Sequence, residues 1–285
     1  MNKGNILVTG ASGMIGSRLV EKLLSAGWSV VGLDRCESRI KVEGYSHYAV
    51  DLGDAAALAE TFEKHKIDRV IHLAALAHTH GEGDLSLERY VHVNVECAKN
   101  VFSVAEKNGV PVLFISTVDV FGFTRGVVTA DTVAHPVTSY GKTKLMAEEE
   151  LKRISAKYSI FRLSPVYTPE IKRDIQKRYY LKEPKYAYII GKGNEYEVLN
   201  VELATQRMLD WCALEPDNKI HVLKDESPLI TSECIRAEKS LGRAKHVIHC
   251  PRWIAVAGYG VLRGLTGKNK YTYLLSKAVY PLKTE

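Results

Sequence analysis

The segment Tyr140-Gly-Lys-Thr-Lys144 places a phenol and an ammonium group four positions apart in a helical pattern. That spacing puts both side chains on the same face of a helix. A phenol with a reference pKa of about 10 is a poor base at neutral pH, but a nearby ammonium group stabilises the phenolate. The pair could therefore exchange a proton with a hydroxyl or carbonyl group of a substrate. Because the same spacing also occurs by chance on surface helices, its meaning depends on the rest of the chain.

A glycine-rich turn lies near the start of the chain, between the strand-like run Asn5–Thr9 and a helical pattern that begins at Met14. Its glycines let the turn close, let backbone N–H groups approach a pyrophosphate, and let the helix pack on the strand. The helix N-terminus would then face the negative charge. The residues expected to contact a dinucleotide here are Gly10, Ser12, Gly13, Met14, Ile15 and Gly16.

Acidic residues follow the next two strand-like runs. Asp34 stands 24 residues after Gly10, where a carboxylate can accept hydrogen bonds from the ribose hydroxyls of NAD. Arg35 follows it and could instead hold the 2′-phosphate of NADP. Asp51 could meet the adenine amino group, or it could cap the helix that begins near Asp54. The predicted cofactor is NAD, with NADP as the alternative.

The elements that would position these side chains alternate regularly over the first two thirds of the chain. Strands are expected near Asn5–Thr9, Ser29–Leu33, Tyr48–Val50, Arg69–Leu73, Val112–Ser116 and Ser159–Leu163. Helices are expected near Met14–Ala26, Ala55–His65, Leu85–Asn108 and Ser139–Tyr158. Uniformly apolar strands that alternate with helices predict an α/β fold with a doubly wound parallel sheet of the Rossmann type.

The pattern changes after Pro165. We expect a basic helix at Glu170–Leu181, a strand at Tyr186–Ile190 and a helix at Glu202–Leu214. The predicted organisation is an NAD(P)-binding Rossmann domain over residues 1–165 and a smaller C-terminal substrate-binding lobe over residues 166–285. The second lobe is expected to fold partly back onto the first.

Five motifs in this order resemble those of the extended short-chain dehydrogenases/reductases, which include nucleotide-sugar epimerases, dehydratases, reductases and decarboxylases. They are TGxxGxxG from Thr9, HLAA from His72, Asn94 in VNVE, STVDVFG from Ser116, and YGKTK from Tyr140. The resemblance covers roughly the first 170 residues. It implies a Rossmann fold, a bound nicotinamide cofactor and a nucleotide-sugar substrate of polysaccharide biosynthesis. It also implies a homodimer formed through the helices at Leu85–Asn108 and Ser139–Tyr158.

The resemblance also assigns roles to single residues. Thr117 would hydrogen-bond the reacting oxygen, Tyr140 would be the acid and base, and Lys144 would lower its pKa and hold the nicotinamide ribose. The cofactor would further contact Asp51, Leu52, Leu73, Ala74, Ala75 and Asn94. The candidate substrate contacts are His78, Ser116, Thr117, Lys172 and Arg173.

The residues after Thr117 bear on the reaction. Sugar-nucleotide 4,6-dehydratases carry two adjacent acids at this point, but this chain has Val118 before Asp119. A valine cannot protonate a leaving hydroxyl, so 4,6-dehydration is disfavoured. Asp119 is either a catalytic acid, as in the decarboxylases, or a hydrogen-bonded aspartate at the end of a strand. The preferred function is a nucleotide-sugar epimerase. The alternatives are an NADPH-dependent 4-keto sugar-nucleotide reductase and a catalytically silent NAD(P)-binding regulator.

Composition excludes several other classes. The chain has 285 residues, 46% hydrophobic and 25% charged, and its longest apolar run, Ile254–Leu265, is too short to span a bilayer. Five scattered cysteines without a CxxC pair predict a cytoplasmic protein with no metal site. Eight basic residues against one acid lie between Arg243 and Glu285. This tail is expected to be solvated, rather than to bind nucleic acid or a membrane surface.

Overall fold

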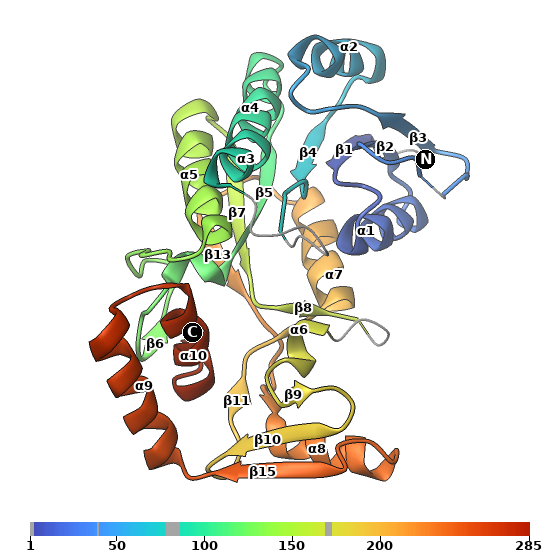
Figure 1. Ribbon diagram of the computed structural model, residues 1–285. Coiled ribbons are helices and arrows are strands. Elements are labelled where there is room, and N and C mark those ends of the chain that lie inside the picture. Colours follow the sequence, from blue (N-terminus) through green and yellow to red (C-terminus); the bar gives the residue numbers. More distant parts are fainter. Residues whose placement is uncertain (1–2, 39, 78–85, 169–172) are drawn as a thin grey trace. The chain divides into compact units, whose positions relative to one another are not determined.

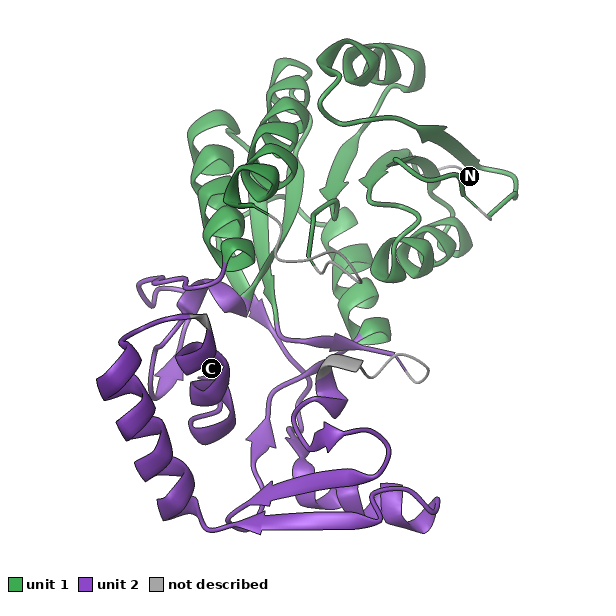
Figure 2. Cartoon of the chain, in the orientation of Figure 1, with its two compact units in different colours: residues 1–117, 139–163, 201–221 green, residues 118–138, 164–200, 222–285 purple. Residues whose placement is uncertain are grey.

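The computed structural model in Figure 1 describes residues 3–38, 40–77, 86–168 and 173–285. The chain forms two compact units, coloured separately in Figure 2. Unit 1 consists of residues 1–117, 139–163 and 201–221, and unit 2 of residues 118–138, 164–200 and 222–285. Residues 201–221 thus return to the unit that contains the N-terminal segment.

A central sheet organises unit 1, with strand order β13-β7-β5-β4-β1-β2-β3. Its strands are β1 (Asn5–Thr9), β2 (Ser29–Asp34), β3 (Tyr45–Ala49), β4 (Arg69–His72), β5 (Val112–Thr117), β7 (Tyr158–Leu163) and β13 (Ile220–Leu223), the last of which crosses into unit 2. The strands from β3 to β7 pair in parallel. The strand order reverses between β1 and β4, which in open α/β sheets is the place where ligands bind. The predicted doubly wound parallel sheet is confirmed.

Helices cover this sheet. They are α1 (Met14–Ser25), α2 (Ala55–His65), α3 (Leu87–Val91), the π-helical turn η1 (His92–Glu96), α4 (Cys97–Lys107), α5 (Ser139–Ile154) and α7 (Val201–Cys212). Helix α4 packs between α2 and α5, and α1 packs against α7. Leu7 of β1 lies in one apolar cluster with residues of α2, α4 and α5. Its neighbours Ile6 and Val8 are equally buried and point to the other face, so both faces of the sheet are covered.

Two boundaries in unit 1 differ by three residues or more from the sequence prediction, and one predicted helix contains an irregular turn. The third strand is Tyr45–Ala49 rather than Tyr48–Val50, because this half-exposed edge strand pairs with β2 from Tyr45 onward. The long helix expected from residue 85 contains the π-helical turn η1. Helix α5 ends at Ile154, four residues before the predicted end, because β7 begins at Tyr158.

Unit 2 contains a three-stranded sheet in the order β15-β10-β9. Its strands are β9 (Tyr180–Lys182), β10 (Tyr186–Ile190) and β15 (His246–Cys250), and its short paired strands are β6 (Val127–Val128), β8 (Val166–Tyr167), β11 (Glu195–Tyr196), β12 (Leu199–Asn200), β14 (Leu229–Ile230) and β16 (Lys283–Thr284). Its helices are the 3-10 turn η2 (Val118–Phe121), α6 (Arg173–Gln176), α8 (Thr231–Ser240), α9 (Arg252–Thr266) and α10 (Lys270–Val279). Among the residues that the structure describes, no helix has both the length and the apolar character needed to cross a membrane.

The helix predicted at Glu170–Leu181 is wrong. Within its described part, α6 has only four residues and the chain enters β9 at Tyr180. Tyr179 and Tyr180 are both buried in an apolar cluster with Ala187 of β10. Antiparallel pairing with β10 therefore prevails over the local helical pattern.

Candidate functional site

The glycine turn is packed so tightly that two of its positions have no room for a Cβ atom. Gly10 has φ +70°, and a Cβ atom there would lie 2.9 Å from the backbone nitrogen of Ala74. A Cβ atom on Gly16 would lie 2.1 Å from the carbonyl oxygen of Gly10. Only glycine fits both positions, because any larger residue would push the first turn of α1 away from β1.

The backbone N–H groups at the N-terminus of α1 have no side-chain acceptor from its N-cap residue. Gly13 precedes the helix, no side chain among the described residues caps it, and its first turn, which holds Met14 and Ile15, carries no acid. The first N–H groups of a helix have no partner within the helix, and the helix dipole adds positive potential there. Such an end fits the pyrophosphate of a dinucleotide.

Asp34 is fixed beside this turn. Its Oδ2 accepts a hydrogen bond from the backbone N–H of Ser12 at 3.0 Å, and its Oδ1 accepts one from the N–H of Arg35 at 2.7 Å. A carboxylate held at the end of β2, next to the glycine turn, fits the ribose hydroxyls of a dinucleotide. The side chain of Arg35 is exposed, so a 2′-phosphate also has a charged partner within the same segment.

Of the two roles considered for Asp51, the structure argues against helix capping. Asp54, not Asp51, caps α2, because its carboxylate accepts from the N–H groups of Ala56 and Ala57 at 3.0 and 3.1 Å. The Asp51 carboxylate accepts from the N–H of Gly53 at 2.8 Å and is otherwise exposed, which leaves it free for an adenine contact. Leu52 beside it is buried.

The segment after β4 is tied to both β1 and α5. Leu73 and Ala74 donate their backbone N–H groups to the carbonyl and hydroxyl oxygens of Thr9, at 3.2 Å each. The loop continues through half-buried Ala75 to Leu76, whose N–H donates to the buried side chain of Asn94 at 2.7 Å. Asn94 in turn donates to the hydroxyl of Thr143 at 3.0 Å. Asn94 therefore links this loop to the helix that carries Lys144.

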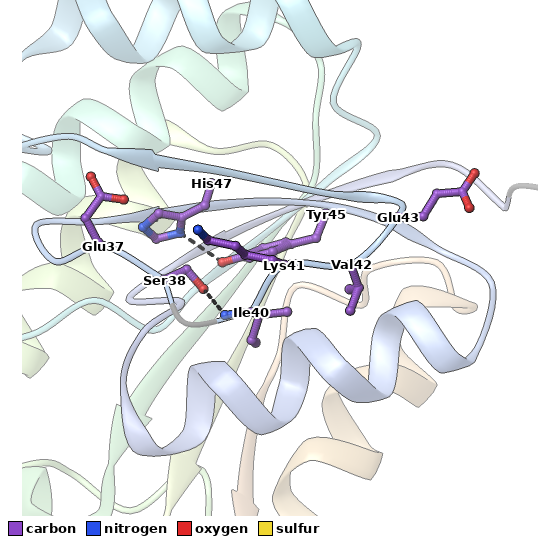
Figure 3. A pocket seen from close by; sticks show the side chains of 8 residues that line it. All are labelled: Glu37, Ser38, Ile40, Lys41, Val42, Glu43, Tyr45 and His47. Atoms are coloured by element: carbon purple, nitrogen blue, oxygen red, sulfur yellow. Dashed lines mark hydrogen bonds between the residues drawn. The ribbon is translucent and has the colours of Figure 1, made fainter.

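A hollow of about 460 Å³ lies in the connection between β2 and β3 (Figure 3). Its lining residues are Glu37, Ser38, Ile40, Lys41, Val42, Glu43, Tyr45 and His47. Internal hydrogen bonds shape it, from the N–H of Ile40 to Ser38 at 3.0 Å and between Tyr45 and His47 at 2.9 Å. It contains none of the residues expected to carry the chemistry.

The candidate catalytic residues lie on adjoining elements of unit 1. Thr117 is the last residue of β5, and Tyr140 and Lys144 lie in the first two turns of α5, which packs against β5. Tyr140 is half-buried, whereas Lys144 is 2% exposed, with its Nζ 4.1 Å from the ring centroid of Phe114. Burial lowers the pKa of Lys144 to about 7, although the nearby Glu148 carboxylate opposes the shift. The ammonium group of Lys144 therefore loses its proton near neutral pH.

Glu148, one helical turn beyond Lys144, forms a buried network that the sequence analysis missed. Its carboxylate accepts from Nε and Nη2 of Arg162 at 3.1 and 2.7 Å, and from the Ser116 hydroxyl at 2.5 Å. Both charged side chains are almost fully buried, at 0% and 4% exposed. The available signal was an arginine within the apolar strand run Ser159–Leu163, together with an acid spaced four positions after Lys144.

Ser116 belongs to this network, which corrects its expected role as a substrate contact. Its hydroxyl donates to Glu148 and the residue is 3% exposed. Successive residues of a strand point to opposite faces, so Thr117 does not share this environment.

Asp119 is surrounded by donors from unit 2. The hydroxyls of Thr138 and Tyr273 donate to its carboxylate at 2.7 and 2.9 Å, and the ammonium group of Lys277 pairs with it. Burial raises its pKa, but Lys277 and the hydroxyl donors outweigh this and hold the pKa below the usual value. A carboxylate that is ionised and held in this way is a poor proton donor. Its contacts favour the structural one of the two roles considered for it.

Some candidates cannot be placed. His78 and Lys172 lie outside the described residues, as does the side chain of Arg173. Over the described parts of the chain, no three His, Cys, Asp or Glu side chains come together as a possible metal site.

The buried Lys144 predicts an unusual dependence of stability on pH. Below the folded-state pKa of about 7, both the folded and unfolded states bind this proton, so the folded protein bears the full penalty of burying the charge. Between that pH and 10.5, the ordinary pKa of a lysine, the unfolded state binds more protons, so the free energy of unfolding rises with pH. We expect Lys144→Met to be more stable than the natural protein at pH 6–7, by roughly 1–3 kcal/mol, although it lacks activity.

Urea unfolding of both proteins between pH 6 and 10 measures this difference, which should shrink as the pH approaches 10. A difference that stays constant over this range would show that Lys144 does not lose its proton within it.

Residues 6–199 match the model of the NAD dependent epimerase/dehydratase family. A UDP-glucose 4-epimerase of Bacillus subtilis is 33% identical over 52% of this chain and 47% of its own length. An N-acetyl-alpha-D-glucosaminyl-diphospho-ditrans,octacis-undecaprenol 4-epimerase of Escherichia coli O157:H7 is 34% identical over 52% of this chain and 43% of its own length. The chain spans about half the length of the curated relatives it matches.

Solved structures match over more of the chain. MoeE5 in complex with UDP-glucose and NAD aligns with a TM-score of 0.69 and 26% identity, over 87% of this chain and 85% of that protein. A UDP-glucuronic acid 4-epimerase from Bacillus cereus in complex with NAD aligns with a TM-score of 0.71 and 22% identity, over 86% and 87% of the two chains. The similarity to the Bacillus cereus enzyme shows the fold alone.

Proposed function

Because the chain belongs to the NAD dependent epimerase/dehydratase family, we propose that it is an NAD-dependent epimerase of a diphosphate-linked sugar. The observation that carries this proposal is the pair Tyr140 and buried Lys144 on one face of α5, in the same unit as the glycine turn. A silent cofactor-binding regulator would not need this pair, and its presence favours an enzyme. Further parts of the proposal are a cytoplasmic homodimer, formed through α4 and α5, that serves polysaccharide biosynthesis.

The residues present fit the cofactor. The uncapped N-terminus of α1 would hold the pyrophosphate, Asp34 the adenosine ribose and Asp51 the adenine, while Ala74 and Ala75 would border the bound molecule. When bound, NAD can accept a hydride from a sugar carbon and return it to either face of the resulting ketone. The absence of room for a Cβ atom at Gly10 and Gly16 keeps the turn tight between β1 and α1 and so positions the N-terminus of α1.

The side chains of unit 1 would move the proton that accompanies this chemistry. Tyr140 would take the proton of the sugar hydroxyl as the ketone forms and give it back as the alcohol re-forms. Lys144, in its charged form, would stabilise the Tyr140 phenolate. Thr117 would donate a hydrogen bond to the same sugar oxygen, and the Glu148 network would keep α5 in place against β5 and β7.

A second candidate is an NADPH-dependent reduction of a 4-keto sugar. The exposed Arg35 next to Asp34 is the observation that favours it. A probable low-salt glycan biosynthesis reductase of Haloferax volcanii, 30% identical over 56% of this chain and 53% of its own length, supports it. Dehydration is disfavoured, because Val118 has no ionisable proton and Asp119 is already engaged by two hydroxyl donors and the ammonium group of Lys277.

The relatives share a sugar attached to a diphosphate, carried by a nucleoside in one case and by a polyprenol in the other. We propose the nucleoside diphosphate as the primary substrate class. Residues 172 and 173 are proposed contacts for that diphosphate, and the residue at 78 for the sugar.

Mass spectrometry of the protein as purified tests the cofactor, and proton NMR of UDP-glucose or UDP-N-acetylglucosamine incubated with it tests the reaction. We expect NAD to be retained and the C4 epimer to accumulate without added cofactor. Empty or NADP-loaded protein that consumes NADPH with a 4-keto sugar nucleotide would establish the reductase instead. Retained NAD with no turnover of either kind would favour the regulator.

A further inference from the structure

Helix α9 turns polar side chains toward the protein and apolar ones outward. Toward the rest of unit 2 it presents Tyr259, which is 3% exposed, and Arg263, whose Nη1 donates to the Tyr259 hydroxyl at 3.2 Å. Arg252, at its start, donates to Asn194 and to the carbonyl of Val279 at 3.3 and 3.2 Å. The polar side chains of this helix thus form hydrogen bonds within unit 2, and most of its large apolar side chains face the solvent.

The apolar side chains form one continuous exposed face. Trp253, Ile254, Val261 and Leu265 are 72%, 45%, 63% and 81% exposed. At about 100° per residue they fall within an arc of roughly 120° around the helix axis. The other residues on or beside this arc are Ala257, Gly258, Gly260 and Gly264, and a Cβ atom at any of the three glycines would meet open space. No charged residue interrupts the face.

We propose that α9 binds the interfacial region of an anionic lipid bilayer, lying parallel to the membrane plane. Helices that do so bury a face of tryptophan and large aliphatic residues about 5–10 Å into the headgroup boundary and are surrounded by basic residues. Figure 2 shows α9 along the edge of unit 2, where α10 packs against it. An interfacial helix need not span the bilayer, so its 15 residues suffice.

Charge selects an anionic membrane over a second copy of the chain. Residues 243–285 contain eight basic side chains and one acid. Three of the eight, Arg243, Lys277 and Lys283, form ion pairs with acids elsewhere in unit 2. The remaining five still outnumber the single acid, so pairing two copies through α9 would bring two basic segments together, whereas an anionic surface attracts them. Lys268, two residues beyond α9, is exposed. This inference does not rest on the proposed function.

Cosedimentation of the full chain with phosphatidylcholine vesicles, with and without phosphatidylglycerol, tests the proposal. We expect binding to the anionic vesicles, weakened by salt, and little binding to the neutral ones. Trp253 should report insertion by a blue shift of its emission, because the other tryptophans, Trp28 and Trp211, are half-buried and buried. Trp253→Glu and Leu265→Glu should each weaken binding at least about tenfold, since each removes apolar contact and adds a repelled charge.

Leu214→Glu is the matched control. Leu214 is 59% exposed but lies in unit 1, after α7, so the same change there should leave vesicle binding unaltered. Circular dichroism and NAD binding verify that each variant folds. The proposal is overturned if the natural protein does not bind anionic vesicles, or if Trp253→Glu binds them as well as the natural protein does. If the natural protein instead forms a dimer that Trp253→Glu dissociates, without binding vesicles, then α9 is a contact between copies.

Discussion

Replacing Tyr140 with phenylalanine is expected to lower kcat by about 10²–10⁴-fold, the usual contribution of a positioned acid or base. The change removes one oxygen atom from a half-buried side chain in the first turn of α5. The proposed cofactor contacts lie mainly in the glycine turn and at the ends of β2, β3 and β4, so NAD should remain bound. Turnover of the sugar nucleotide by NMR and NAD content by mass spectrometry measure the two effects separately.

Tyr271→Phe serves as the control for this experiment. Tyr271 is 74% exposed on α10 and lies outside the proposed machinery, so its loss of a hydroxyl should leave kcat unchanged. Undiminished turnover in Tyr140→Phe would remove the phenol from the mechanism. Loss of both turnover and NAD would show that the residue holds the cofactor rather than transfers a proton.

The sheet and the cofactor turn could be predicted from sequence because their signals are local. Gly10 has a φ of +70°, and a Cβ atom on Gly16 would strike the Gly10 carbonyl, both within one strand–turn–helix unit, while Asp34 follows at the end of the next strand. Apolar strands such as Val112–Thr117 are recognisable without knowing their neighbours. These features need only short-range information.

The remaining parts depend on residues distant in sequence. Ser116 looked like a substrate contact until β7 placed Arg162, and hence Glu148, beside it. The two roles of Asp119 stayed open until α10, more than 150 positions later, supplied Tyr273 and Lys277. A local pattern shows which kinds of group a residue could contact, but only the fold determines which group is its actual partner.

Glu148→Gln is expected to lower the free energy of unfolding by about 3–5 kcal/mol, because it leaves the Arg162 guanidinium buried without its counter-charge. Both side chains are at most 4% exposed, so water cannot replace the lost carboxylate. Urea unfolding measures the loss. Glu150→Gln is the control on the same helix: Glu150 pairs with Arg153 in an ion pair whose side chains are 28% and 63% exposed, and removing such a pair changes stability by less than about 1 kcal/mol.

The same variant should also change the pH dependence of turnover, which a purely structural residue would not do. The Glu148 carboxylate raises the pKa of Lys144 against the larger effect of burial, so its neutralisation should move that pKa further below about 7. Because the proposed mechanism needs Lys144 charged, the alkaline limb of the kcat profile should shift to lower pH, at a temperature where the variant is still folded. A destabilised variant with an unshifted profile would mean that Glu148 only holds α5 to the sheet. Arg162→Met in the Glu148→Gln background separates the two effects. It should recover stability, since the unpaired charge is gone, whereas a shifted profile should persist if the carboxylate tunes Lys144 directly.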